Sequence, residues 1–128
     1  MKSLLHEWIA KAEGDFHTAT RERRARSHPN PDALCFHAQQ CVEKYLKAWL
    51  LQHKIGVGRT HDLGELLHLC LTKRPHWELL REPILLLNQY AVEVRYPGEA
   101  ASPAEAREAY AILKRLRQEI RKDLHLPG

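Results

Sequence analysis

The stretch FHAQQCVEKYLKAWLL, residues Phe36–Leu51, decides the fold of this chain. At about 100° per residue, its apolar residues share one side of a helix and its polar residues gather almost opposite. The apolar side holds Ala38, Cys41, Val42, Tyr45, Leu46 and Trp49, and the polar side holds Gln40, Glu43, Lys44 and Lys47. This pattern predicts a bundle helix whose charged stripe faces outward. The stripe has two readings, a solvated surface or one wall of a binding site.

Start and stop signals on both sides of this stretch predict further helices. Ser3 caps a first helix that reaches about Arg26. Pro31 occupies the first turn of the second helix, which runs to about Lys54. Two prolines between these helices prevent one continuous helix, so the pair forms a hairpin.

The second half of the chain also contains helix start and stop signals. Thr60 or Asp62 caps a short third helix that ends by Lys73 or Arg74, and Glu65 completes a capping-box spacing with Asp62. We expect a turn or kink near residues 81–82 and then a continuous helix from Pro83 to about Arg95. The segment Ser102-Pro103-Ala104-Glu105 has a cap, a proline at the first helical position and a capping-box glutamate, and it opens the last helix.

These elements predict an all-α protein, an antiparallel up-and-down four-helix bundle with an additional short helix. No run alternates apolar and polar residues over the length of a strand between turn signals. The 128 residues fit one domain, which we place over the whole chain, 1–128.

Composition and residue patterning argue against a secreted, a membrane-spanning or a metal-binding protein. Acidic residues in the first turns argue against a secretory signal, and no apolar run is long enough for a membrane span, so we expect a cytoplasmic protein. Cys35, Cys41 and Cys70 lie in apolar helical stretches and are expected to be free buried thiols. No His/Cys ligand spacing predicts a metal site, and we expect no cofactor.

The net charge is +4, and the Lys and Arg residues are spread along the chain with one cluster, at the end of the first predicted helix: Arg21, Arg23, Arg24 and Arg26. Such a cluster favours phosphate. Lys and Arg at a helix C-terminus also offset the helix dipole, and this second reading is the more common one.

Three local patterns, in this order, resemble the HEPN domain family. They are Gln39-Gln40-Cys41-Val42-Glu43-Lys44-Tyr45-Leu46-Lys47-Ala48, then Thr60-His61-Asp62-Leu63, then Arg95-Tyr96-Pro97. The resemblance spans nearly the whole chain. It implies a helical bundle that dimerises, is commonly encoded beside a small nucleotidyltransferase and forms toxin–antitoxin-like modules. Some members are metal-independent ribonucleases.

The ribonuclease branch of that family uses an Arg followed four to six residues later by a His. Arg95 matches the Arg, but positions 100–102 hold Ala100, Ala101 and Ser102, none of which exchanges a proton as imidazole does. We therefore expect a non-catalytic module that binds nucleotide or RNA. The alternative is a ribonuclease in which His61 acts with Arg95.

The predicted ligand-binding set joins the polar stripe to two helix ends. It contains Gln40, Glu43, Lys44, Lys47, His61, Asp62, Arg95 and Tyr96. The opposing interpretation is structural: the Thr60–Asp62 segment caps a helix, Arg95 pairs with Glu43 or Asp62, and Tyr96 packs at a helix end. Trp8, Trp49 and Trp77 are expected in the core or a dimer interface.

Overall fold

The computed structural model describes residues 3–90 and 96–128, and within them the chain is helical and contains no strand. This confirms the expected all-α class. The elements are α1 (Leu4–Arg24), α2 (Pro31–Gln52), α3 (Leu63–Cys70), the 3₁₀ helix η1 (Pro75–Leu80), α4 (Arg81–Tyr90) and α5 (Pro103–Asp123). The predicted end of the fourth helix near Arg95 lies outside the described residues.

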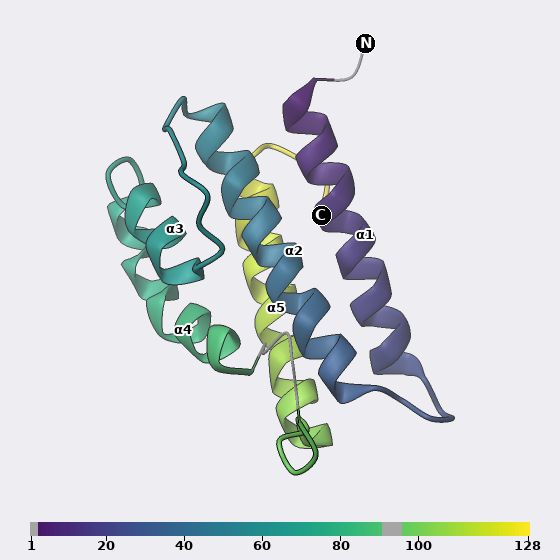
Figure 1. Ribbon diagram of the computed structural model, residues 1–128. Coiled ribbons are helices and arrows are strands. Elements are labelled where there is room, and N and C mark those ends of the chain that lie inside the picture. Colours follow the sequence, from purple (N-terminus) through teal and green to yellow (C-terminus); the bar gives the residue numbers. More distant parts are fainter. Residues whose placement is uncertain (1–2, 91–95) are drawn as a thin grey trace.

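The helices alternate in direction, as Figure 1 shows. α1 runs down in that view, α2 runs up beside it, η1 and α4 lead down again, and α5 returns upward. α3 is the additional short helix, inserted between α2 and η1. α2 packs against α1, α3, α4 and α5, so it is the central element of the bundle.

Capping side chains set the starts of the helices. Ser3 and Asn30 accept hydrogen bonds from backbone N–H groups in the first turns of α1 and α2. Ser102 and Glu105 form the reciprocal capping box that their spacing predicts. An Asp32 carboxylate oxygen also accepts the N–H of Ala101 at 2.7 Å, which ties the start of α5 to the first turn of α2.

Two local predictions need correction. Asp62 caps α3, but Glu65 does not close a capping box: its carboxylate accepts a hydrogen bond from Thr60 Oγ1 at 2.6 Å, and the Asp62 N–H donates to that same hydroxyl. α4 begins at Arg81 rather than at Pro83, because proline needs no N–H partner in the first turn of a helix.

The outward charged stripe predicted for α2 is wrong. Glu43 is 3% exposed, and Gln40, Lys44 and Lys47 are half-buried. The reason is tertiary, because neighbouring elements cover the polar side of α2 as well as its apolar side. Each polar side chain there needs a partner inside the protein, since a buried polar group without one is costly.

The core forms between α2 and the helices around it. Trp49 and Trp77, expected in the core or a dimer interface, lie in the core: they are at most 1% exposed, and their ring centroids are 4.9 Å apart. Trp8 is only half-buried. The three thiols are free and buried as predicted, Cys35 and Cys41 on α2 and Cys70 at the end of α3.

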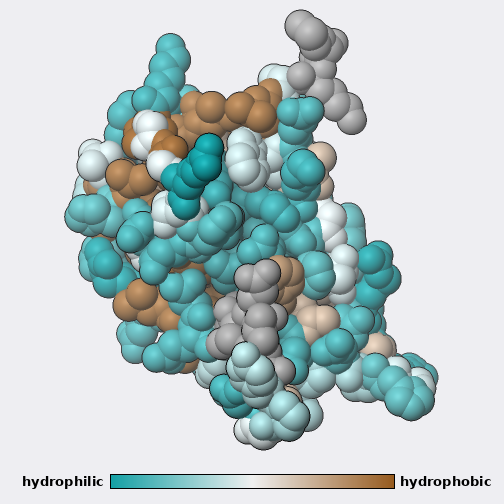
Figure 2. All heavy atoms as spheres, in the orientation of Figure 1, coloured by the Kyte–Doolittle hydropathy of each residue, from teal (hydrophilic) through white to brown (hydrophobic). Residues whose placement is uncertain are grey.

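Within the described ranges, no helix is long and apolar enough to cross a membrane. On the face shown in Figure 2, hydrophobic residues gather along the upper edge, over the end of α2, and the middle of the face is hydrophilic.

Candidate functional site

A buried carboxylate on α2 organises the candidate site. Glu43 Oε2 lies 3.0 Å from Lys47 Nζ, one turn further along α2, and 3.0 Å from Nδ1 of His61. The Glu43 side chain is 4% exposed, whereas that of His61 is 77% exposed. The carboxylate therefore anchors an imidazole that is itself open to solvent.

The anchoring selects a tautomer for the histidine. When His61 Nδ1–H donates to Glu43, Nε2 carries the free lone pair. Such an imidazole accepts a proton or a hydrogen bond from a ligand, and once protonated it attracts an anion. Gln39 supports this arrangement, because its side-chain amide donates to the His61 carbonyl at 3.2 Å and thereby holds the backbone of the loop against α2.

The second carboxylate oxygen of Glu43 is unusual. Oε1 is buried, and no hydrogen-bond donor meets it within residues 3–90 and 96–128. A buried acceptor without a donor costs about 1 to 3 kcal/mol. Glu43 Oε1 is therefore a buried acceptor that the described residues leave unused.

An apolar groove of about 280 Å³ begins beside Lys47 and extends over the end of α2. Trp8 forms one wall, with Lys47 Nζ 5.5 Å from the centre of its ring. The loop of residues 55–58 and Leu51 complete the lining. The sequence did not predict that Trp8 lines this site. The signal that could have shown it is the position of Trp8 at the edge of the apolar stripe of the first helix.

Asp62 lies beside this site but has a structural task. It caps α3 by accepting the Glu65 N–H at 3.1 Å, and it lines a separate open hollow of about 540 Å³ with Thr60, His68 and Arg81. The capping interpretation of this residue is confirmed. A carboxylate at the start of α3 also disfavours anion binding at that helix end.

The four other predicted site residues have different outcomes. Gln40 lies next to the site, with its amide donating to Gln39 at 2.9 Å. Lys44 points to α1, where its ammonium pairs with Asp15, so it is not part of the Glu43 cluster. Tyr96 is 67% exposed, so the prediction that it packs at a helix end is wrong. Arg95 lies outside the described residues, and so does its predicted pairing with Glu43 or Asp62.

Among the described residues, no group of three or more His, Cys, Asp or Glu side chains could hold a metal ion. The side chains of the site provide a solvent-facing imidazole, an ammonium and a buried carboxylate.

Comparison with known proteins gives the family and the fold. The HEPN domain family matches the chain over residues 5–123. The crystal structure of ST0689, an archaeal HEPN homologue, is similar with a TM-score of 0.73 at 24% identity, covering 96% of this chain and 98% of that one. The crystal structure of TT1696 from Thermus thermophilus is similar with a TM-score of 0.71 at 22% identity, covering 92% and 96%. No curated protein matches the chain.

Proposed function

This chain belongs to the HEPN domain family, and on that premise we propose that it is a non-catalytic, dimeric binding module of the cytoplasm. Its ligand is a nucleotide or RNA, and its partner is a small nucleotidyltransferase in a toxin–antitoxin-like pair. The partner and the dimer follow from what the family resemblance implies. The ligand class follows from the chemistry of the Glu43 cluster.

One observation carries the non-catalytic part of the proposal. The ribonuclease branch would need its histidine at positions 100–102. In this chain, two residues at these positions have structural roles. Ala101 is 5% exposed and donates its N–H to Asp32, and Ser102 caps α5 through the capping box. Neither residue transfers protons near neutral pH. The start of α5 is therefore built for stability at the place where catalysis would require an imidazole.

The Glu43 cluster supports recognition of a nucleotide. Lys47 and a protonated His61 attract phosphate, and the exposed Nε2 of a neutral His61 accepts a hydrogen bond from a donor such as a ribose hydroxyl or an exocyclic amine, while the buried Glu43 holds both side chains in place. Trp8, with Lys47 Nζ 5.5 Å from the centre of its ring, adds an aromatic surface next to these groups. This combination matches the mixed charged, polar and aromatic character of a nucleotide.

Thermal shift with a panel of nucleotides tests the ligand class. A ligand at 100 times its dissociation constant stabilises a protein by about 2.7 kcal/mol. We expect His61→Ala to abolish the shift and His76→Ala, at a histidine of η1 outside the cluster, to retain it. A panel in which no nucleotide shifts the wild-type protein contradicts nucleotide recognition.

Co-expression with a small nucleotidyltransferase encoded beside this gene tests the partner. A shared gel-filtration peak is expected. Separate elution of the two proteins at micromolar concentration would remove the partner from the proposal. Light scattering on the chain alone measures its oligomeric state, and a monomeric mass would contradict the dimer.

A second function is favoured by one specific observation, the hydrogen bond between Glu43 and the exposed His61. A histidine oriented by a buried carboxylate is suited to act as a general base toward a ribose 2′-hydroxyl. Arg95 would then supply the phosphate contact in a metal-independent ribonuclease. RNA cleavage in EDTA that disappears in both Arg95→Ala and His61→Ala would establish this alternative, and uncut RNA would eliminate it.

A further inference from the structure

A second hollow, of about 370 Å³, lies on the seam between α1 and α5. We call it the seam groove, and its lining residues are Arg23 and Arg24 of α1 and Arg107, Tyr110, Ala111 and Lys114 of α5. Four of these six residues are cations and none is acidic. α2 contributes nothing to the lining, so the groove is separate from the Glu43 cluster.

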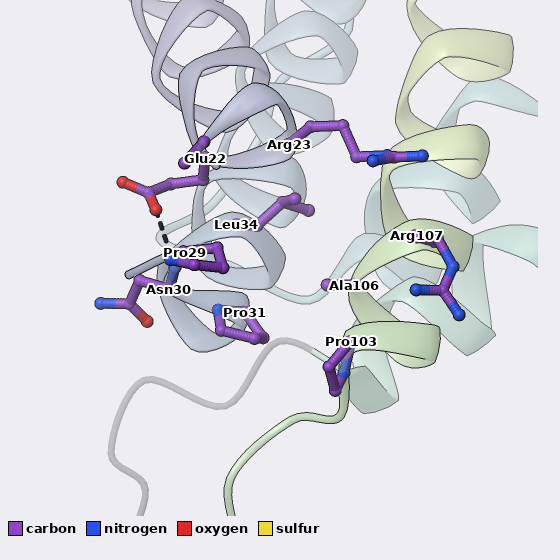
Figure 3. Close-up of a pocket in the computed structure, with 10 residues that line it drawn as sticks. Glu22, Arg23, Pro29, Asn30, Pro31, Leu34, Pro103, Ala106 and Arg107 are labelled. Atoms are coloured by element: carbon purple, nitrogen blue, oxygen red, sulfur yellow. Dashed lines mark hydrogen bonds between the residues drawn. The ribbon is translucent and has the colours of Figure 1, made fainter. Parts of the chain in front are cut away.

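The cations of the groove stand apart from the acidic residues around them. In the described ranges, no ion pair involves Arg23, Arg24, Arg107 or Lys114. Neighbouring acids are engaged elsewhere. Glu22 accepts the Asn30 N–H at 2.8 Å, and Glu108 accepts the Tyr90 hydroxyl at 3.0 Å. Figure 3 shows Arg23 extending from α1 towards α5, where Arg107 lies, while Glu22 points away towards Asn30.

Helix dipoles explain only half of this cluster. Arg23 and Arg24 lie in the last turn of α1, where cations offset the dipole. Arg107 lies near the first turn of α5, where the dipole disfavours a cation, and Lys114 lies in the middle of that helix. The helix dipole therefore does not account for the α5 cations, and repulsion among the cations of the groove is relieved when an anion binds.

The groove has a fixed floor. Tyr110 shares a hydrogen bond of 2.9 Å with Thr20 Oγ1 and stacks nearly parallel on Phe16, with ring centroids 6.3 Å apart. Lys114 Nζ lies 5.8 Å from the centre of the Tyr110 ring. These contacts hold α1 and α5 together, and so fix the backbone positions from which the four cations extend.

A recess of about 170 Å³ continues from the groove and shares Arg23 and Arg107 with it. Its apolar lining is Pro29, Pro31, Leu34, Pro103 and Ala106, as Figure 3 shows, and Ala25, Asn30 and Glu22, whose carboxylate accepts the Asn30 N–H, complete the wall. A ligand that fits both parts alternates negative charge with flat apolar surface. Inorganic polyphosphate lacks the apolar part, and a membrane surface does not enter a recess between helices, whereas an unstacked nucleic acid strand has both properties.

We propose that the seam groove binds the phosphodiester backbone of single-stranded RNA and that the adjoining recess takes an unstacked base. The proposal deepens the proposed recognition of nucleotide or RNA and rests on it for the class of ligand. It adds a second anion site, remote from the Glu43 cluster, through which a strand longer than one nucleotide is held.

Fluorescence anisotropy with a labelled single-stranded RNA tests the groove on the full chain. We expect Arg107→Glu with Lys114→Glu to weaken binding at least tenfold. It should also lower the slope of log affinity against log salt by about 1.4, since each lost phosphate contact on a single strand contributes about 0.7. The control, Lys54→Glu with Lys73→Glu, makes the same charge change on exposed lysines at the opposite end of the bundle, and it should bind within twofold of wild type.

The outcomes separate a failure of the groove from a failure of the proposed function. Equal losses in both double variants, or wild-type binding by the groove variant, would overturn the seam groove as the RNA site. Tight binding of inorganic polyphosphate, or of anionic phospholipid vesicles in place of RNA, would overturn the nucleic acid assignment. The part of the mononucleotide thermal shift that His61→Ala abolishes reports on the Glu43 cluster, and that part should be unchanged in the groove variant. Circular dichroism checks folding, and Arg107→Ala with Lys114→Ala serves as the milder variant.

Discussion

α1 and α5 carry charge in two different ways along their length. Towards the end where α5 finishes, charged side chains that face the neighbouring helix meet opposite charges. Glu13 of α1 accepts two hydrogen bonds from Arg117, at 2.6 and 2.8 Å, and also pairs with Arg121. Towards the start of α5, the same two helices form the seam groove, which cations line and no acid does. One helix pair thus contains both a paired region and an unpaired one.

The contrast teaches how to interpret surface charge in this protein. In the paired region charges neutralise one another, so they serve the fold. Tyr45 links this network to α2, because its hydroxyl donates to Glu13 and accepts from Arg121 at 2.8 Å. In the seam groove the described residues provide no such neutralisation, so its charges are available to a ligand. Mutations that separate stability from binding test this division.

The largest effect is expected at Asp15, which is 9% exposed and bonds to both His37 and Lys44. Asp15→Asn leaves a half-buried ammonium without its anion, so we expect the free energy of unfolding to fall by about 3 kcal/mol. Urea denaturation measures this change. Glu7→Gln, an exposed acid on the same helix, should change stability by less than about 0.5 kcal/mol. A loss at Asp15 no larger than that of the control would show that the buried ion pairs between α1 and α2 do not stabilise the fold.

A smaller loss, about 2 kcal/mol, is expected for Glu13→Gln, because this carboxylate is more exposed than that of Asp15. A double-mutant cycle with Arg117→Gln isolates the pair, since two residues in contact do not contribute additively. A coupling energy near zero would mean that Glu13 and Arg117 are neighbours without mutual stabilisation.

Acid should remove the contribution of Glu13. Burial by itself raises the pKa of this carboxyl, but the hydrogen bonds from Arg117 and Tyr45 outweigh it, so the pKa lies below its ordinary value of 4.5. Between the lowered pKa and 4.5 the unfolded chain binds more protons, and stability falls as the pH falls. Urea unfolding should show the difference between wild type and Glu13→Gln complete above pH 4.5 and shrinking below it. A difference that is constant with pH would contradict a lowered pKa.

The smallest effect on stability is expected in the seam groove. Arg107→Ala with Lys114→Ala removes repulsion and no ion pair of the described residues, so the free energy of unfolding should stay within about 0.5 kcal/mol of wild type or rise slightly. Any gain should diminish as added salt screens the wild-type repulsion. A clear destabilisation would show that these cations stabilise the fold, as the charges of the paired region do. The contrast between the paired region and the seam groove would then not hold.

Local signals explain what the sequence predicts well. Ser102, Pro103 and Glu105 act within one turn of helix, so their spacing predicts the start of α5 without knowledge of its neighbours. The all-helical class follows in the same way from periodicity. The sequence predicts the ends of helices less accurately. α1 stops before the predicted Arg26 because the backbone at Ala25 is already extended.

Tertiary contacts explain what the sequence predicts poorly. The burial of Glu43 depends on how many elements surround α2, and an amphipathic pattern does not contain that information. Lys44 belongs to the site by sequence but turns to Asp15, 29 residues away. The α5 wall of the seam groove could be predicted from the sequence, because its residues follow the i, i+3, i+4, i+7 spacing of one helix face: Arg107, Tyr110, Ala111 and Lys114. That this face lies next to Arg23 and Arg24 of α1 could not be predicted from the sequence.

The reactivity of the three buried thiols reports on local opening of this fold. Burial raises the pKa of the Cys41 thiol well above its ordinary range and that of Cys70 to about 12, so neither reacts as thiolate while the helices stay packed. Alkylation of the native protein must therefore wait for a local opening. Because Cys70 ends α3 while Cys35 and Cys41 lie on α2, the order in which the three are labelled tells which layer detaches first.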